Sequence, residues 1–438
     1  MVSLDLDRLR REIYSCDRVR TTGKVRSVNG IMGCTLPAAL GDQCEIVTGP
    51  NRSVLAEVVG FADGVTHLVP YDPPESISAG MPVLRLGREL KVPVGPQLLG
   101  RVLDGLGRPL DGRGPVVAAE RRPVRTSSPS ALERVRIRTP FVTGLRAIDG
   151  ILTCGCGQRV GIFSGSGVGK SILLGEIAKS SDSDVNVITL VGERGREVKP
   201  FLDDCLGPDG LARSVVVTAT CDQPALMRIR AARAAVTIAD YFREKGKNVL
   251  FLLDSLTRLA MAQRELGLSL GEPPTARGYT PSVFQLLATT VECLGNSNRG
   301  SITGILTVLV DGDDLDEPIS DAVRSLVDGH IVLDRRLAEK GHFPAIDIAR
   351  SVSRVAHEIT SDSQRVSVRK IREIMAAYAE VEDLIRIGAY VKGTSPQVDR
   401  AIELRPVIDL FLKQSLGAKS AFQETRAALE KIAASWPY

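Results

Sequence analysis

The spacing of hydrophobic positions changes along the chain, and each spacing predicts a different kind of structure. From Thr21 to about Gly87, short β-type segments are separated by Gly, Pro, Asn and Asp turns. The segments include 23–28, 44–47, 54–59 and 65–69. Strands this short and this regularly spaced predict a small all-β barrel over residues 21–87.

The middle of the chain changes first to a connector and then to buried strands. Residues 88–150 are rich in Gly and Pro, and the prolines predict an extended connector. Continuous apolar or β-branched runs then alternate with helical patterns such as 224–243. The runs are 185–190, 214–218, 249–253 and 305–310. They are typical of parallel strands buried on both faces, so residues 88–360, connector included, are predicted to form a doubly wound α/β core.

Both ends of the chain have helical spacing. From about Ser361 onward the segments 368–375, 381–385, 398–411 and 422–432 predict a separate helical domain over residues 361–438. Near the start, Leu6, Leu9 and Ile13 share one face and mostly basic residues occupy the others, which predicts an amphipathic helix within residues 1–20. This helix either caps the next domain or docks on a partner or an acidic membrane surface.

Composition narrows the class of protein. With 438 residues, the chain is too long for one compact core, and 43% hydrophobic and 25% charged residues are typical of a soluble globular protein. A net charge of +4 and only 4% aromatic residues give no reason to expect nucleic acid as the main partner. Eight scattered cysteines without a C-x-x-C pair predict reduced thiols. Since no apolar run approaches the ~20 residues of a membrane span and no signal peptide is evident, we expect a cytosolic protein.

One stretch combines a buried strand, a glycine-rich loop and a helix start. It has the sequence RVGIFSGSGVGKS over residues 159–171. Backbone N–H groups of such a loop point at an anion and the helix dipole adds positive potential, so the stretch predicts a phosphate site. The expected nucleotide-binding residues are Ser164, Gly165, Ser166, Gly167, Val168, Gly169, Lys170, Ser171 and Ile172. Lys170 supplies a charge, and the Ser171 hydroxyl can ligate Mg²⁺. The strict pattern has Gly where Ser164 stands; the alternative is a turn that binds nothing.

Two more strand ends bring carboxylates to the same edge of the predicted sheet. The run 249–253 ends in Asp254, which can hold the Mg²⁺ shell or, alternatively, cap the next helix. A strand ending at Gly192 is followed by Glu193, which can orient the attacking water unless the GERGRE stretch is only a solvated charge cluster. Arg258 is expected on the first turn after Asp254, where it contacts the γ-phosphate side or holds Glu193.

Together these motifs resemble the ATPases of type III protein export. They are GSGVGKS (165–171), GERGREV (192–198), DSLTRLAMAQRE (254–265) and GEPPTARGYTPSVF (271–284). The resemblance continues through Asp313-Asp314, DGHIVL (328–333), PAID (344–347), SVSR (351–354) and IRIGAYVKG (385–393). It implies the fold of rotary ATP synthase subunits: a small N-terminal β-barrel, a P-loop (RecA-like) parallel-sheet core and a C-terminal helical domain. The GSGVGKS loop is more similar to the flagellar branch than to the injectisome branch.

The resemblance also implies roles for individual residues. Arg354 matches the arginine that reaches into the neighbouring subunit's site, where a guanidinium stabilises charge developing on the γ-phosphate. Phe343 matches an aromatic position that stacks on adenine, although an ordinary core Phe is the alternative. The expected catalytic residues are Lys170, Glu193, Arg194, Arg258 and Arg354; Ser171 and Asp254 are the expected metal ligands, and ATP and Mg²⁺ the expected cofactors.

Partners and location follow from the same resemblance. The chain is expected to form a homohexameric ring, with residues 271–284 facing its centre. The N-terminal helix is expected to bind the export regulator, a stator-like protein. Export chaperone–substrate complexes and export-gate membrane proteins are further expected partners, and nucleic acid is not. The expected location is the cytoplasm, peripheral to the inner face of the cytoplasmic membrane.

The predicted function is Mg²⁺-dependent ATP hydrolysis that assists protein export through a flagellar type III apparatus. Three alternatives stay open. The first is the ATPase of an injectisome. The second is a hexameric RNA translocase, which also joins a small β-barrel to a P-loop core, although this barrel lacks clustered aromatics. The third is a ring subunit that binds nucleotide without hydrolysing it, and the presence of Glu193 argues against it.

Overall fold

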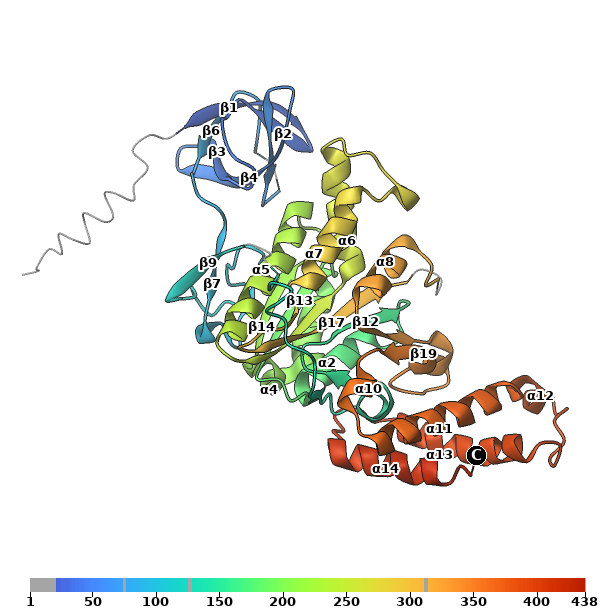
Figure 1. Cartoon of the computed structure of the whole chain (residues 1–438). Helices are drawn as coiled ribbons and strands as arrows, with labels where there is room; N and C mark the ends of the chain where they lie inside the picture. Colours follow the sequence, from blue (N-terminus) through green and yellow to red (C-terminus); the bar gives the residue numbers. More distant parts are fainter. Residues whose placement is uncertain (1–20, 74–75, 125–127, 311–313, 438) are drawn as a thin grey trace, which may run out of the picture.

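The computed structural model describes residues 21–437 except 74–75, 125–127 and 311–313 (Figure 1). The predicted N-terminal helix, within residues 1–20, and Asp313 therefore lie outside the described residues. In the described part, no helix has the length and apolar character needed to cross a membrane. The seven cysteines that the structure describes are all unpaired thiols.

The N-terminal unit is a closed six-stranded barrel with the order β1-β2-β5-β4-β3-β6. Its strands are β1 (Thr22–Asn29), β2 (Ile31–Cys34), β3 (Gln43–Gly49), β4 (Arg52–Ala62), β5 (Val65–Pro70) and β6 (Pro82–Arg85). Alternate residues such as Ile46, Val58 and Leu68 fill its interior. Hydrophobic spacing predicted β1, β3, β4 and β5. It missed β2 and β6, because strands of four residues are too short to show an alternation.

The connector is more structured than an extended linker. Strands β7 (Lys91–Val94) and β9 (Glu120–Pro123) pair with each other, and β10 (Pro140–Phe141) pairs with β11 (Cys154–Gly155). Strand β8 (Val102–Leu103) joins the central sheet beside β14. Helical turns at Pro96–Leu98 and Ala147–Ile151 complete it. Pro123 and Pro140 therefore mark the ends of short strands, and a two-residue strand has no periodicity for a sequence to reveal.

A nine-stranded sheet forms the core, with the order β19-β18-β12-β17-β15-β13-β14-β8 and β16 paired to β17. Besides β8, its strands are β12 (Arg159–Ser164), β13 (Val185–Val191), β14 (Ser214–Ala219), β15 (Asn248–Asp254), β16 (Gly295–Asn296), β17 (Ser301–Leu309), β18 (Gly329–Leu333) and β19 (Ile346–Ser353). From β18 to β8 the neighbours are parallel, whereas β19 runs antiparallel to β18. The carboxyl ends of β12, β13 and β15 therefore meet at one edge.

Helices cover both faces of this sheet (Figure 1). They are α2 (Lys170–Ser180), α3 (Gly195–Pro200), the π-helical turn Phe201–Leu206, α4 (Gly207–Ala212), α5 (Ala225–Glu244), α6 (Leu256–Ser269), the short turn Ala276–Gly278, α7 (Pro281–Glu292), α8 (Pro318–Leu326), α9 (Arg335–Glu339) and α10 (Ala356–Ile359). Successive strand residues enter different cores: Phe251 belongs to the core under α5, and Leu250 and Leu252 to the core under α2. This two-sided burial explains the continuous apolar runs and confirms the predicted α/β fold class.

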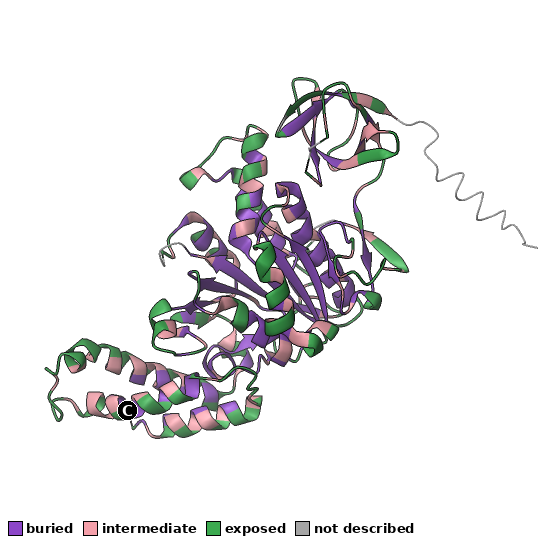
Figure 2. Ribbon diagram, turned by 180° about the vertical axis from the view of Figure 1, so that it is seen from behind, coloured by how far each residue is buried: buried purple, intermediate pink, exposed green. Residues whose placement is uncertain are grey.

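The C-terminal helices are α11 (Asp362–Ala379), α12 (Glu382–Arg386), α13 (Pro396–Leu412) and α14 (Phe422–Ala434). Their inner residues, including Ile374 and Ile408, belong to the same hydrophobic core as α2. Figure 2 shows that the sheet is buried and that the outer surfaces of these helices are exposed. The helical domain therefore packs on the same side of the sheet as the glycine-rich loop's helix.

Candidate active site

The glycine-rich loop occupies residues 165–169, between the end of β12 and the start of α2. Gly167 and Gly169 have φ angles of 80° and 91°, a conformation that glycine adopts without strain. A side chain at Gly169 would place its Cβ 3.6 Å from the Phe343 ring. Ser164, the departure from the strict motif, is buried as the last residue of β12. The backbone is therefore shaped as a loop that can approach a phosphate closely.

Four charged side chains meet beside this loop. Lys170 Nζ lies 2.5 Å from Asp254 Oδ1 and 3.8 Å from Glu193 Oε1. Arg258 Nε donates to Glu193 Oε1 at 3.2 Å, so of the two sequence-based alternatives for Arg258 the structure has the contact with Glu193. The Lys170 ammonium group therefore lies between two carboxylates, and the Arg258 guanidinium holds one of them. These four groups form a compact polar centre at the carboxyl edge of the sheet.

The parallel register brings these residues together. Asp254 ends β15, and Leu190 of the neighbouring β13 pairs with it, so that Glu193 follows just beyond. The Asp254 carboxylate also accepts a hydrogen bond from Thr307 Oγ1 on β17 at 2.8 Å. The cap of helix α6 is Ser255, whose side chain accepts from Arg258 N. Asp254 is therefore free of the helix-capping role that the sequence had left open.

The environment raises the pKa of Glu193 above its usual range. Burial is the largest cause, and the neighbouring Asp254 carboxylate adds to it, while Lys170 and Arg258 act in the opposite direction. A carboxylate with a raised pKa accepts a proton more readily than an exposed one does. The position of Glu193 suits it to accept a hydrogen bond from a water molecule near the loop.

The oxygen donors at this edge fit Mg²⁺. Ser171 is exposed on the first turn of α2, and Asp254 supplies a carboxylate. Mg²⁺ binds hard oxygen ligands, keeps several waters and commonly takes only one or two protein ligands beside substrate phosphates. Across the described residues, no group of three or more His, Cys, Asp or Glu side chains is arranged to hold a metal. The donors present suit a metal ion that arrives with a phosphate ligand.

A cavity of about 710 Å³ opens beside the loop. Its walls include Val168, Gly169 and Ile172 from the loop and α2, Phe343, and residues 413–416 after α13. Phe343 is 44% exposed, so it is not an ordinary core residue. An aromatic side chain in a mostly apolar cavity next to a phosphate loop suits a flat heteroaromatic ring.

The segment after α13 was missed by sequence reasoning. Gln414 accepts a hydrogen bond from Arg146 N at 3.0 Å and donates to Gly144 O at 2.8 Å. Glu176 of α2 accepts from Gly417 N at 2.8 Å. These contacts seat a C-terminal segment against the cavity. No motif marks the segment, since its partners are more than 200 residues away in the sequence.

Two expected catalytic residues lie outside the central cluster. Arg194 is largely exposed and pairs with Glu197 at 3.3 Å. Arg354 follows β19, and the antiparallel pairing of Ser353 with Gly329 places it at the amino edge of the sheet, opposite the loop. The six residues of β12 separate the two edges by roughly 20 Å at ~3.3 Å per residue. Arg354 is exposed there and is too far away to reach the loop of its own chain.

Comparison with known protein families divides the chain into three matched regions. Residues 33–87 match the β-barrel domain of the ATP synthase alpha/beta family, and residues 144–353 match its nucleotide-binding domain. Residues 360–431 match the T3SS EscN ATPase C-terminal domain.

Individual proteins match over nearly their whole length. The flagellum-specific ATP synthase of Treponema pallidum is 49% identical over 94% of this chain and 93% of its own. The protein of the same name from Bacillus subtilis is 49% identical over 96% and 97%, and the type 3 secretion system ATPase of Xanthomonas euvesicatoria is 44% identical over 97% of each. Among solved structures, the assembled ATPase EscN of the enteropathogenic E. coli type III secretion system has a TM-score of 0.89 at 44% identity, over 94% of this chain and 100% of that one.

Proposed function

The chain belongs to the family of flagellum-specific ATP synthases and type III secretion ATPases, and we propose that it hydrolyses ATP with Mg²⁺ to assist protein export through a flagellar type III apparatus. Its fold and its family make it an ATP hydrolase. The observation that carries the proposal is the meeting of Lys170, Glu193 and Asp254 at the carboxyl edge of the sheet, beside the glycine-rich loop.

We assign the phosphate-side work to residues of the loop and its neighbours. Lys170 and the loop amides bind the phosphates, and in doing so Lys170 exchanges its contact with Asp254 for the ligand. Asp254 and the Ser171 hydroxyl would hold Mg²⁺, which would supply positive charge to the phosphates. The adenine lies in the cavity against Phe343. The geometry supports this assignment because loop, carboxylate and cavity are contiguous.

We assign the activation of the attacking water to Glu193. Its carboxylate orients the attacking water, and Arg258 holds that carboxylate in place. Arg194, which pairs with Glu197, is proposed to contribute only positive potential near the loop.

We further propose that the active form is a homohexameric ring in which Arg354 of one copy completes the site of the next. Its place at the edge opposite its own loop supports a role in trans. Among the relatives, EscN has been solved as an assembled ATPase and in complex with its central stalk EscO, at a TM-score of 0.87 and 43% identity for the complex. A regulator or stalk partner, export chaperone–substrate complexes and export-gate proteins are the proposed partners, at the inner face of the cytoplasmic membrane.

Two measurements test the proposal. ATP hydrolysis per subunit is expected to rise with protein concentration, because sites form between copies; a rate that is independent of concentration would count against the trans role of Arg354. A pull-down from cells is expected to bring flagellar chaperones and export-gate proteins. Recovery of injectisome components instead would reassign the apparatus, and hydrolysis stimulated by RNA would support the translocase alternative.

A further inference from the structure

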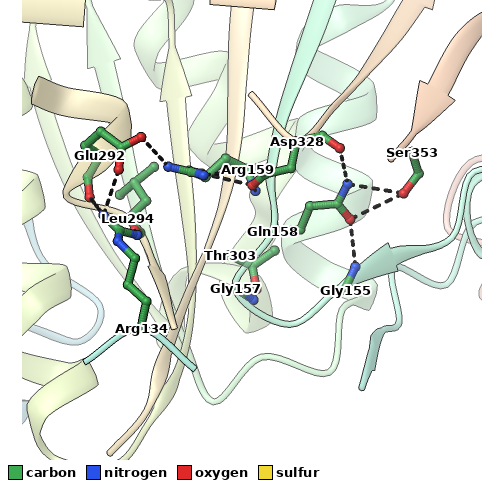
Figure 3. Close-up of polar contacts among 10 residues, drawn as sticks. All are labelled: Arg134, Gly155, Gly157, Gln158, Arg159, Glu292, Leu294, Thr303, Asp328 and Ser353. Carbon is green, nitrogen blue, oxygen red and sulfur yellow. Dashed lines mark hydrogen bonds and ion pairs between the residues drawn. The ribbon is translucent and has the colours of Figure 1, made fainter. Parts of the chain in front are cut away.

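A polar cluster, partly buried and built around the buried Gln158, lies at the amino end of β12, at the opposite end of that strand from the phosphate loop (Figure 3). We call it the strand-base cluster and define it as Gln158, Arg159, Glu292, Asp328 and Ser353. One of its members, Asp328, accepts a hydrogen bond from the backbone of Arg354. The established and proposed chemistry uses none of the cluster's members, although Arg159 forms ion pairs with both Asp328 and Glu292.

Arg159 and Asp328 form the centre of the cluster. The Arg159 guanidinium donates to both carboxylate oxygens of Asp328, from Nε at 2.9 Å and from Nη2 at 3.0 Å, and the Arg159 backbone N–H donates to the same carboxylate at 3.0 Å. A two-pronged contact of this kind sets orientation as well as distance. On its other side, Arg159 Nη1 lies 2.8 Å from Glu292 Oε1 at the end of α7. Asp328 is therefore fixed relative to β12 and α7.

Gln158 extends the cluster toward β19. Its side-chain Nε2 donates to Asp328 O at 3.0 Å and to Ser353 Oγ at 3.1 Å, and its Oε1 accepts from Gly155 N at 2.8 Å. Gln158 is fully buried, so loss of any of these bonds would leave a polar group without water to replace its partner. The amide thus ties Ser353, the last residue of β19, to the start of β12.

Arg354 follows directly in the chain and depends on the same anchor. Its backbone N–H donates to Asp328 O at 3.0 Å, so the Asp328 carbonyl accepts from both Gln158 and Arg354. The Arg354 side chain, by contrast, is exposed, and its Nη2 donates to Arg324 O at 3.2 Å. The backbone of Arg354 is fixed by the cluster while its guanidinium projects from it.

We propose that Gln158, Arg159 and Asp328 are positioning residues for Arg354. Each copy of the chain uses its phosphate loop in its own site and its Arg354 in the site of its neighbour, and β12 connects the two. This inference rests on the proposed function, because it requires Arg354 to act in trans. A six-residue strand buried between two neighbours is a stiff connection. A shift at the loop end is therefore transmitted to Asp328 and from there to the backbone of Arg354.

Rings assembled from two different variants test the two roles of each copy separately. The first variant, called the donor, carries Glu193→Gln, so it supplies Arg354 to its neighbour but has an inactive site of its own. The second variant, called the receiver, carries Arg354→Ala, so it has an intact site but supplies no arginine. Each is expected to be nearly inactive alone, and their mixture is expected to recover hydrolysis. Gln158→Leu is then added either to the donor or to the receiver, and phosphate release is measured at saturating ATP.

The expected result is asymmetric. In the donor, Gln158→Leu is expected to lower the recovered rate by about tenfold to a hundredfold, since a displacement of ~1 Å of a catalytic group has that effect. In the receiver, the change is expected to be less than about threefold, since the arginine arrives from the other copy. Ser353→Ala in the donor removes one partner of the Gln158 amide without a large cavity, and we expect the same asymmetry at smaller size.

Asp111→Asn in the donor is the matched control. Asp111 holds Arg101 with the same two-pronged contact, at 2.6 and 3.0 Å, but lies in the connector. Asp111→Asn is expected to leave the recovered rate of hydrolysis unchanged. If donor and receiver suffer equally from Gln158→Leu, or if neither suffers, the inference is overturned while the proposed function stands. If donor and receiver recover nothing when mixed, the trans role of Arg354 fails, and the inference fails with it.

Discussion

At the carboxyl edge of the central sheet a lysine lies between two carboxylates, whereas at the amino edge an arginine does. The two arrangements differ in how completely they are bonded. Lys170 touches Asp254 at 2.5 Å but reaches Glu193 only at 3.8 Å, and the pKa of Glu193 is raised. At the other edge, Arg159 contacts both Asp328 and Glu292 within 2.9 Å.

The two edges are suited to different tasks. The carboxyl edge borders a cavity, and its ammonium ion is placed where it can exchange a carboxylate for a phosphate. The amino edge uses a planar guanidinium, which holds orientation, and a buried amide, which cannot be left unpaired. One edge is therefore suited to ligand exchange and the other to holding a position.

Lys170→Ala removes the exchangeable charge. We expect ATP hydrolysis to fall by roughly 10³-fold, because the developing phosphate charge loses its main cation at the loop. Phosphate release at saturating ATP measures the loss. Lys179→Ala, on the last turn of the same helix and paired with Glu176, is the control and is expected to stay within about twofold. A fully active Lys170→Ala protein would contradict the assignment of the loop.

Glu193→Gln keeps shape and removes the proton acceptor. We expect kcat to fall by about 10²-fold or more with ATP binding retained, because general-base assistance is lost. Binding of a fluorescent nucleotide and steady-state kinetics give the two readouts. Glu197→Gln changes a neighbour whose side chain contacts Glu193 without replacing the proton acceptor, and it is expected to lower kcat much less than Glu193→Gln does. Equal losses in the two variants would show that the motif acts only as a charge cluster.

Asp328→Asn weakens the fixed edge without touching the loop. We expect kcat of the homogeneous ring to fall by about tenfold with little change in KM for ATP, because Arg354 is displaced while the ATP-binding loop is intact. The split between kcat and KM distinguishes this from damage to the binding site. A rise in KM with kcat preserved would show that Asp328→Asn acts on ATP binding at the loop. The two edges of the sheet would then not have different roles.

Phe343→Leu tests the cavity beside the carboxyl edge of the sheet. We expect KM for ATP to rise by about three- to tenfold with kcat retained, since the loss of one aromatic stacking contact has this size. Phe61→Leu replaces an exposed aromatic on the barrel and serves as the control, with no expected change in KM. An unchanged KM in the Phe343 variant would return that residue to a packing role.

Arg258→Met removes the group that holds Glu193, and its distinguishing effect is on the pH profile of hydrolysis. Arg258 lowers the pKa of Glu193, against the larger effect of burial, so its removal raises that pKa further. Hydrolysis needs ionised Glu193 and is lost as pH falls through this pKa. The acid limb of the rate profile is therefore expected to move to higher pH. A limb that does not move would show that another group sets it.

Local pattern predicted much of the fold and of the loop-side site. Asp254 and Glu193 each follow a strongly apolar strand, and parallel strands end at a common edge, so their meeting with Lys170 was foreseeable. The short strands β2, β6 and β8 were not, because two to four residues carry no period. The domain limits at 20, 87 and 360, and the residue roles, stay predictions.

Local spacing is enough to predict the phosphate loop, the carboxylates that follow the apolar strands and the order of barrel, core and helical domain. It gives no sign that Gln158 meets Asp328 and Ser353, which are 170 and 195 residues away, or that Arg354 lies opposite its own loop. The contact with Asp328 depends on the parallel pairing of β18 with β12, and the positions of Ser353 and Arg354 depend on the antiparallel pairing of β19 with β18. No periodicity in the chain encodes those pairings.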